Sequence, residues 1–298
     1  MKIDDVKTIG VIGAGNMGHQ IVTLCAINGY RSICMDSDEA TLKKAEAFVD
    51  RYLPGRVEKE RLTAAQAEQA RKNLTFTSSL EETVKEADYV IEAVIEVVDV
   101  KRKLFADLDR IAPPHAILAT NSSAIVSSRI AGATTRPEKV VNVHFFNPAL
   151  VMKLVEVVLP VGVAPETVET TLELCKKLGK VPVKVKDIPG FIVNRLLMGL
   201  YMEAAQIVLE GTATAEEVDT AMKLGAGHPM GPCELADFGG FDVIQMACDQ
   251  VFEYTHRESD RLNILYRKMV EAGRLGRKNG KGFYDYLPDG TKKPFQIF

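Results

Sequence analysis

The sequence predicts an α/β fold in which a doubly wound, mostly parallel sheet precedes a second, smaller, all-helical domain. Over the first 187 residues, short apolar runs alternate with longer helical patterns, as in a sheet covered on both faces by helices. The pattern changes at Lys186-Asp187-Ile188-Pro189-Gly190, and the segments after it show helical periodicity. A chain of 298 residues is long enough for two domains. We therefore expect one domain over residues 1–187 and the other over residues 188–298.

The first domain is expected to contain seven strands, several of them continuous apolar runs that suit burial on both faces. They are residues 8–12, 32–35, 89–94, 116–120, 140–145, 153–158 and 182–185. Helices are expected between them at residues 40–51, 63–73, 101–111 and 166–178. In the second domain, helices are expected at residues 192–209, 215–224, 241–256 and 262–272.

Composition and charge exclude several classes of protein. Hydrophobic residues make up 46% and charged residues 26% of the chain, which excludes a disordered chain, a collagen-like fibre and a coiled coil. The formal net charge is −3, so we expect neither nucleic acid nor an anionic membrane as a partner. Any anionic ligand must therefore be bound by local groups.

Cysteine usage and the N-terminal segment predict a cytoplasmic protein. The five cysteines are widely spaced and form no C-x-x-C pair or zinc-binding pattern, so we expect reduced core thiols and no metal. No secretion signal or transit peptide is recognisable. Residues 8–30 carry no formal charge, but their glycines and polar residues suit a turn better than a membrane span.

A glycine-rich motif predicts a dinucleotide site of the Rossmann type. Gly13-Ala14-Gly15-Asn16-Met17-Gly18 follows the first strand and opens a helix, where backbone amides favour phosphate groups. Asp36 lies 23 residues after Gly13, at the end of the second strand, where a carboxylate can bind a ribose diol and repel the extra phosphate of NADP. The motif therefore predicts NAD as cofactor. The alternative is a glycine-rich turn beside an ordinary surface aspartate.

Two residues on adjacent predicted strands suggest acid–base chemistry. His144 ends one strand, and Glu156 lies twelve residues later among apolar residues of the next. An unpaired carboxylate there is costly, and a histidine held by a carboxylate is suited to act as a general base. The alternative, a satisfied core histidine and a solvent-facing glutamate, stays open on spacing alone.

Taken together, these motifs resemble the L-3-hydroxyacyl-CoA dehydrogenase family, most closely its bacterial members that act on 3-hydroxybutyryl-CoA. The resemblance covers nearly the whole chain. The stretches that carry it are Gly13–Gly18, Ile91-Glu92-Ala93, Asn121-Ser122-Ser123, His144-Phe145-Phe146-Asn147-Pro148, Met152–Glu156, Pro189–Arg195, His228–Pro232 and the run from Leu275 to Tyr284.

The resemblance implies roles for several of the matching residues. His144 would be the general base, Glu156 its orienting carboxylate, and Ser123 and Asn194 would position the substrate oxygens. It also implies a homodimer formed through the helical domain. Residues near the cofactor would be Glu96, Lys101, Ser123, Asn147 and Lys278, and basic residues near the CoA phosphates would be Arg51, Arg56 and Lys59. The sequence departs from the family pattern at Ala124 and at Phe238-Gly239-Gly240-Phe241, which leaves the acyl-chain preference open.

The implied activity is the reversible, NAD-dependent oxidation of a short-chain (S)-3-hydroxyacyl-CoA to the 3-oxoacyl-CoA. The sequence contains no metal-ligand cluster, and no Tyr-x-x-x-Lys pair of the short-chain dehydrogenases. One alternative is an NAD-linked dehydrogenase of a CoA-free hydroxy acid such as L-gulonate. A second is a catalytically inactive nucleotide-binding structural protein, since a fold does not determine function.

Overall fold

The computed structural model describes residues 1–296, and the chain divides into two compact units, Met1–Phe191 and Ile192–Phe298. Each unit has its own hydrophobic core. The first unit ends five residues after its last strand, which closes at Lys186.

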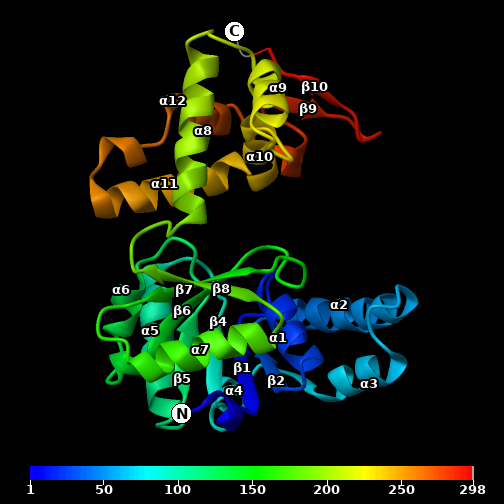
Figure 1. Ribbon diagram of the computed structural model, residues 1–298, viewed down its shortest axis with the longest axis vertical. Coiled ribbons are helices and arrows are strands. Elements are labelled where there is room, and N and C mark those ends of the chain that lie inside the picture. Colours follow the sequence, from blue (N-terminus) through cyan, green and yellow to red (C-terminus); the bar gives the residue numbers. More distant parts are fainter. Residues whose placement is uncertain (297–298) are drawn as a thin grey trace. The chain divides into compact units, whose positions relative to one another are not determined.

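An eight-stranded sheet forms the centre of the first unit, in the order β3-β2-β1-β4-β5-β6-β7-β8 (Figure 1). All neighbouring strands are parallel except β6 and β7, which are antiparallel. The order of β3 to β6 is that of a doubly wound dinucleotide-binding fold, so the predicted fold class is confirmed. The strands are β1 (Thr8–Ile12), β2 (Arg31–Met35), β3 (Leu74–Thr77), β4 (Tyr89–Glu92), β5 (Ile117–Thr120), β6 (Val140–Phe145), β7 (Leu154–Leu159) and β8 (Val181–Lys186).

Helices cover both faces of this sheet, because alternate side chains of its strands point to opposite sides. On β4, Tyr89 and Ile91 belong to the larger apolar cluster, whereas Val90 belongs to another cluster together with Phe105. The helices are α1 (Gly18–Ile27), α2 (Glu39–Glu58), α3 (Ala64–Lys72), α4 (Leu80–Val84), α5 (Val98–Ile111), α6 (Ser127–Ala131) and α7 (Pro165–Lys177), with short 3-10 turns η1 (Ile3–Asp5) and η2 (Pro137–Lys139).

The first unit differs from the sequence prediction in two instructive places. The half-exposed edge strand β3 was missed because its apolar alternation, Leu74-Thr75-Phe76-Thr77, spans only four residues and directly follows a predicted helix. Strand β4 ends at Glu92 rather than Val94, because the Glu92 carboxylate accepts the Val94 N–H at 2.7 Å and the chain turns there.

The second unit is mainly helical, as predicted, but it is not entirely so. It also contains helix α10, which the prediction missed, and a small antiparallel hairpin of β9 and β10. Asp237 accepts the backbone N–H groups of Phe283 and Tyr284, so a tertiary contact fixes the hairpin's start. The elements are α8 (Val193–Leu209), α9 (Ala215–Gly225), α10 (Pro232–Gly239), α11 (Phe241–Thr255), η3 (Glu258–Asp260), α12 (Ile264–Glu271), η4 (Arg277–Asn279), β9 (Tyr284–Tyr286) and β10 (Lys292–Pro294).

Within residues 1–296, no helix has the length and apolarity needed to cross a membrane. The same residues bring together no group of three or more histidine, cysteine or acidic side chains able to hold a metal ion. All five cysteines are buried and free: Cys25, Cys34, Cys175, Cys233 and Cys248.

Candidate active site

The glycine-rich loop joins β1 to α1 at the carboxyl edge of the sheet. Gly13 has a φ of +98°, and a Cβ on it would lie 2.6 Å from the Ala93 carbonyl oxygen. A Cβ on Gly18 would lie 1.7 Å from the Gly13 oxygen, so both positions require glycine for packing. A Cβ on Gly15 would meet nothing within 4 Å. Protein packing therefore does not explain Gly15, and the open space beside it suits close approach of a ligand phosphate.

The Asp36 carboxylate lies beside this loop, one residue after β2. Its Oδ2 accepts the Ala14 N–H at 2.8 Å, and its Oδ1 accepts the Asp38 N–H at 3.0 Å. The side chain is half-buried, so it keeps access to a ligand while its orientation is held. This is the position predicted for a ribose-binding acid.

The loop after β6 reaches the same glycine-rich segment. The Asn147 Oδ1 accepts a hydrogen bond from Asn16 Nδ2 at 3.1 Å and lies 3.5 Å from Gln20 Nε2. The peptide bond between Asn147 and Pro148 is cis. The structure thus brings Asn147 to Asn16, two of the residues that the sequence analysis assigned to the cofactor.

His144 and Glu156 face each other across the antiparallel pair β6–β7, in direct register. His144 Nδ1 lies 2.8 Å from Glu156 Oε2, and the two residues are only 5% and 1% exposed. The imidazole also packs on the rings of Phe146 and Phe191, at centroid distances of 4.6 and 5.4 Å. Because a carboxylate only accepts, Nδ1 donates, and the neutral ring keeps Nε2 as its proton acceptor.

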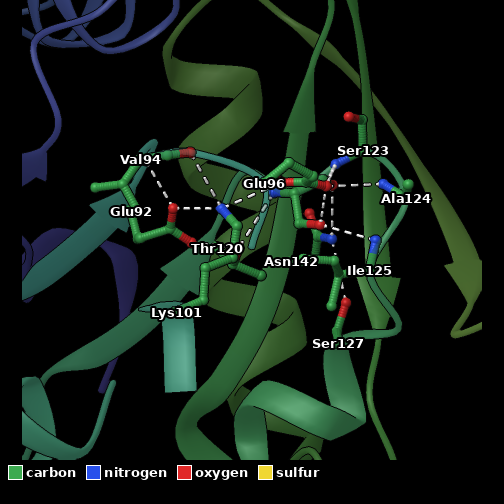
Figure 2. A network of polar contacts seen from close by, with 11 residues as sticks. Glu92, Val94, Glu96, Lys101, Thr120, Ser123, Ala124, Ile125, Ser127 and Asn142 are labelled. Carbon is green, nitrogen blue, oxygen red and sulfur yellow. Dashed lines mark hydrogen bonds and ion pairs between the residues drawn. The ribbon is translucent and has the colours of Figure 1, made fainter. Parts of the chain in front are cut away.

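A buried ion pair occupies the end of β4 (Figure 2). Glu92 is fully buried, and its Oε1 lies 2.5 Å from Nζ of Lys101, a residue of α5 that is 1% exposed. Glu92 Oε2 accepts the hydroxyl of Thr120, at the end of β5, at 2.6 Å. Every oxygen of this buried carboxylate therefore has a partner, as burial of a charge requires.

Glu96 connects the same lysine to the turn that carries Ser123. Its Oε2 lies 3.2 Å from Lys101 Nζ, and its Oε1 accepts the N–H groups of Ser123 and Ala124 at 2.9 and 3.0 Å and the Ser122 hydroxyl (Figure 2). Burial acts to raise the pKa of Glu96, but Lys101 and these donors hold it below the ordinary value. The carboxylate therefore stays ionised at neutral pH.

A basic hollow lies along one face of α2, which we call the α2 hollow. It encloses about 400 Å³. The rings of Phe48 and Tyr52 are stacked at 5.4 Å, and the Arg56 guanidinium lies 5.8 Å from the Tyr52 ring. The structure thus brings the three predicted CoA-contacting cations to one site. The lining residues are Phe48, Arg51, Tyr52, Gly55, Arg56 and Lys59.

The remaining predicted residues belong to the second unit. Asn194 lies in the first turn of α8, and Lys278 lies in η4, where its ammonium pairs with Asp242 at the start of α11. His228 is half-buried in the loop between α9 and α10, and its N–H donates to the Met222 oxygen.

Sequence reasoning assigned no role to several members of the polar network in the first unit. Asn142 is one of them; its Nδ2 donates to the Ser122 oxygen and the Ser127 hydroxyl at 3.0 and 3.1 Å. Glu92 is another, although an acid ending an apolar strand already indicates a buried carboxylate that needs partners. The partners themselves come from α5 and β5, which only the fold brings together.

Comparison with known proteins identifies the class and then the family. Residues 8–188 match the protein-family model described as "3-hydroxyacyl-CoA dehydrogenase, NAD binding domain", and residues 190–286 match "3-hydroxyacyl-CoA dehydrogenase, C-terminal domain". Fold and matches together define an NAD-dependent oxidoreductase. The chain belongs to the 3-hydroxyacyl-CoA dehydrogenase family, as its sequence motifs predicted.

Individual relatives match over almost their whole length. A probable 3-hydroxybutyryl-CoA dehydrogenase of Bacillus subtilis is 40% identical over 286 residues, covering 95% of this chain and 98% of the relative. The human mitochondrial hydroxyacyl-coenzyme A dehydrogenase is 40% identical over 291 residues, covering 94% and 91%. The crystal structure of (S)-3-hydroxybutyryl-CoA dehydrogenase PaaH1 from Ralstonia eutropha superposes with a TM-score of 0.92 at 37% identity, covering 95% of this chain and 100% of that one.

Proposed function

We propose that this enzyme oxidises a short-chain (S)-3-hydroxyacyl-CoA reversibly to the 3-oxoacyl-CoA, with the His144–Glu156 pair as its general base. The observation that carries the proposal is the buried 2.8 Å contact between His144 Nδ1 and Glu156 Oε2. The names of the relatives, several of them 3-hydroxybutyryl-CoA dehydrogenases, support the short acyl chain.

In the oxidative direction, His144 Nε2 takes the proton of the substrate's 3-hydroxyl group. NAD, when bound, supplies the acceptor for the hydride from C3. Glu156 stabilises the imidazolium that forms and fixes the ring orientation, because a carboxylate at Nδ1 favours the protonated ring. In the reductive direction the same imidazolium returns its proton to the carbonyl oxygen. Ser123 and Asn194 orient that oxygen.

The first unit supplies groups that fit NAD. The loop Gly13–Gly18 offers backbone amides at the start of α1 to the pyrophosphate, and Asp36 accepts from the adenosine ribose diol. Asn147, Glu96 and Lys101 border the same edge of the sheet. The family resemblance also assigns Lys278 to the cofactor. The open space at Gly15 supports this assignment.

The α2 hollow is the proposed site for the nucleotide part of CoA. Arg51, Arg56 and Lys59 present cations to phosphates, and the stacked Phe48–Tyr52 pair presents a ring face to a base. Among the described residues, none of the three cations pairs with a protein carboxylate. Their charges are therefore available to an anionic ligand.

We further propose that the second unit carries a homodimer interface. Large apolar side chains are exposed on it, including Leu196 of α8 at 70%, Phe238 at 58%, and Val243 and Met246 on one face of α11. Exposed apolar patches of this kind mark association surfaces. Light scattering at micromolar concentration should give twice the chain mass, and a stable monomer would contradict the proposal.

A substrate comparison tests the activity directly. With NADH, the enzyme should reduce acetoacetyl-CoA far faster than free acetoacetate or other CoA-free oxo acids. Preference for a free oxo acid would favour a CoA-free hydroxy-acid dehydrogenase. NADH binding without any turnover would favour an inactive nucleotide-binding protein.

A further inference from the structure

Glu92 is a buried carboxylate for which the proposed chemistry has no use. It ends β4 with 0% exposure, and it directly contacts neither His144 nor Ser123 in the contacts described above. Its two oxygens accept from three donors, Lys101 Nζ, the Val94 N–H and the Thr120 hydroxyl. A charge is retained in such a place only with a full set of partners.

One route from Glu92 to Ser123 runs through Lys101. The ammonium lies 2.5 Å from Glu92 Oε1 and 3.2 Å from Glu96 Oε2, so Glu92 holds it on the side away from the turn. The other oxygen of Glu96 is thereby left to the Ser123 and Ala124 N–H groups (Figure 2).

A second route runs through Thr120. Its hydroxyl donates to Glu92 Oε2 at 2.6 Å, and its oxygen accepts the Ser122 N–H at 3.1 Å. Because the hydroxyl proton is committed to Glu92, the oxygen lone pairs point to the turn. Both oxygens of Glu92 therefore act, by separate paths, on the turn of residues 122–124.

We propose that Glu92 is a positioning residue that fixes the turn of residues 122–124 through Lys101 and Thr120. Without its charge, Lys101 moves fully onto Glu96, and Glu96 turns away from the amides of Ser123 and Ala124. The Ser123 hydroxyl then loses its fixed direction. The inference rests on the proposed function where it gives Ser123 a role toward substrate, whereas the ordering of the turn is independent of that role.

The first experiment follows the turn in the protein without substrate or cofactor. Hydrogen exchange of peptides spanning residues 121–126 should be about tenfold faster in Glu92→Gln than in the unmodified enzyme. The matched control is Asp109→Asn. Asp109 is also a nearly buried carboxylate, paired with Arg136 and accepting from Thr135, but at the far end of α5. The control should lower the melting temperature similarly and leave exchange in the turn within about twofold.

The second experiment is a double-mutant cycle on kcat for acetoacetyl-CoA reduction. Glu92→Gln should lower kcat about tenfold in the unmodified enzyme but less than about twofold in the Ser123→Ala background, because neighbours that act as a unit are not additive. The proposal would be overturned if the two substitutions lowered kcat by the product of their single effects. It would also be overturned if Glu92→Gln left hydrogen exchange in the turn unchanged. An inert Ser123→Ala would instead remove Ser123 from the proposed function, and the exchange result would still decide the role of Glu92.

Thr120→Val provides a variant of nearly unchanged shape if Glu92→Gln does not fold. It cuts the second route alone, so exchange in the turn should rise about threefold with the Lys101 pairing retained. Glu92→Asp, which keeps the charge but shortens the reach, should restore part of the protection. Protection equal to that of the unmodified enzyme in Thr120→Val would overturn the second route and the proposal with it.

Discussion

The two units treat their buried carboxylates differently. In the first unit, Glu92, Glu96 and Glu156 each face a basic side chain, either Lys101 or His144. In the second, Asp219 and Asp237 accept hydrogen bonds from backbone amides and from the hydroxyls of tyrosines, and neither forms an ion pair among residues 192–296.

The pKa values of Glu96 in the first unit and of Asp219 and Asp237 in the second move in opposite directions. That of Glu96 is held low despite burial, because Lys101 and several donors favour its charge. Burial raises the pKa of Asp237 to about 6, and it also raises that of Asp219. The difference indicates separate uses. In the first unit a basic side chain stabilises each buried carboxylate as an anion, whereas Asp237 fastens a loop so tightly that a Cβ on Gly282 would lie 2.1 Å from its Oδ1.

The largest expected effect concerns the His144–Glu156 pair of β6 and β7. His144→Ala should lower turnover about 10²–10⁴-fold, the usual range for loss of a general base. Glu156→Gln keeps the shape but removes the charge that stabilises the imidazolium, so it should also slow turnover. The double variant should be far less impaired than the product of the two, because both residues serve one proton transfer. Turnover of acetoacetyl-CoA with NADH measures all three.

Circular dichroism and NADH fluorescence titration provide the controls for these variants. Each variant should keep its fold and bind NADH nearly as well, since the Gly13–Gly18 loop does not contact His144 or Glu156 in the contacts described. If both single variants fold and turn over substrate normally, the general base lies elsewhere. The pairing of Glu156 with His144 would then be structural, like the contacts of Asp237 in the second unit.

The next effect is on stability against pH, and it tests the second unit. Asp237 binds its proton more tightly in the folded protein, so its contribution to stability is complete below about pH 4 and is lost as the pH rises through about 6. A shift of about two pKa units corresponds to about 3 kcal/mol. Urea unfolding of the unmodified enzyme and of Asp237→Asn should therefore give a stability difference that falls between these pH values.

For Glu96→Gln, the stability difference measured by urea unfolding should change with pH in the opposite direction. The lowered pKa of Glu96 means that its contribution is present above the unfolded-state pKa and is lost as the pH falls. Its stability difference should therefore grow with rising pH. If the stability differences of the two variants changed with pH in the same direction, the distinction between the ion-paired Glu96 and Asp237, which forms no ion pair among residues 192–296, would be contradicted.

Local patterns in the sequence were sufficient for much of the first unit. Continuous apolar runs placed β1, β5 and β6 within a residue of their observed bounds, and the Gly13–Gly18 motif with Asp36 predicted the cofactor class. Strict alternation placed Glu156 on one face of β7, and its antiparallel pairing with β6 put it opposite His144. These features depend on residues close in sequence or on one strand pair.

Features that depend on tertiary partners were not predictable in the same way. Lys101 was assigned to the cofactor by resemblance, yet its buried position between Glu92 and Glu96 follows from the packing of α5 on β4. The hairpin of β9 and β10 likewise depends on Asp237, 46 residues before the Phe283 N–H that it accepts. No local pattern encodes either contact.

A smaller effect is expected at Asp36, a carboxylate that faces backbone amides as Asp237 does but remains half-exposed. Asp36→Ala should weaken NAD binding by about 1–2 kcal/mol, because it removes charged hydrogen bonds to the ribose diol and loosens Ala14. It should also reduce the preference for NAD over NADP. Fluorescence titration with NADH and NADPH measures both affinities. Equal catalytic efficiency of the unmodified enzyme with NAD and NADP would contradict the assignment of Asp36.

The smallest effect is expected in the α2 hollow, where three cations lie without carboxylate partners among residues 1–296. Arg51→Ala, Arg56→Ala and Lys59→Ala should each raise the KM for acetoacetyl-CoA about three- to tenfold and leave kcat nearly unchanged, since each removes one screened contact to phosphate.

Acetoacetyl-pantetheine, which lacks the nucleotide, isolates this contribution of the α2 hollow. Its KM should not respond to the three substitutions, and added salt should weaken acetoacetyl-CoA binding more in the unmodified enzyme than in the variants. Arg71→Ala is the matched control, because Arg71 of α3 is already paired with Glu46 and Asp50 of α2. A KM rise for the pantetheine substrate, or an equal rise with Arg71→Ala, would mean that the substitutions disturb α2 itself. The CoA nucleotide would then bind elsewhere.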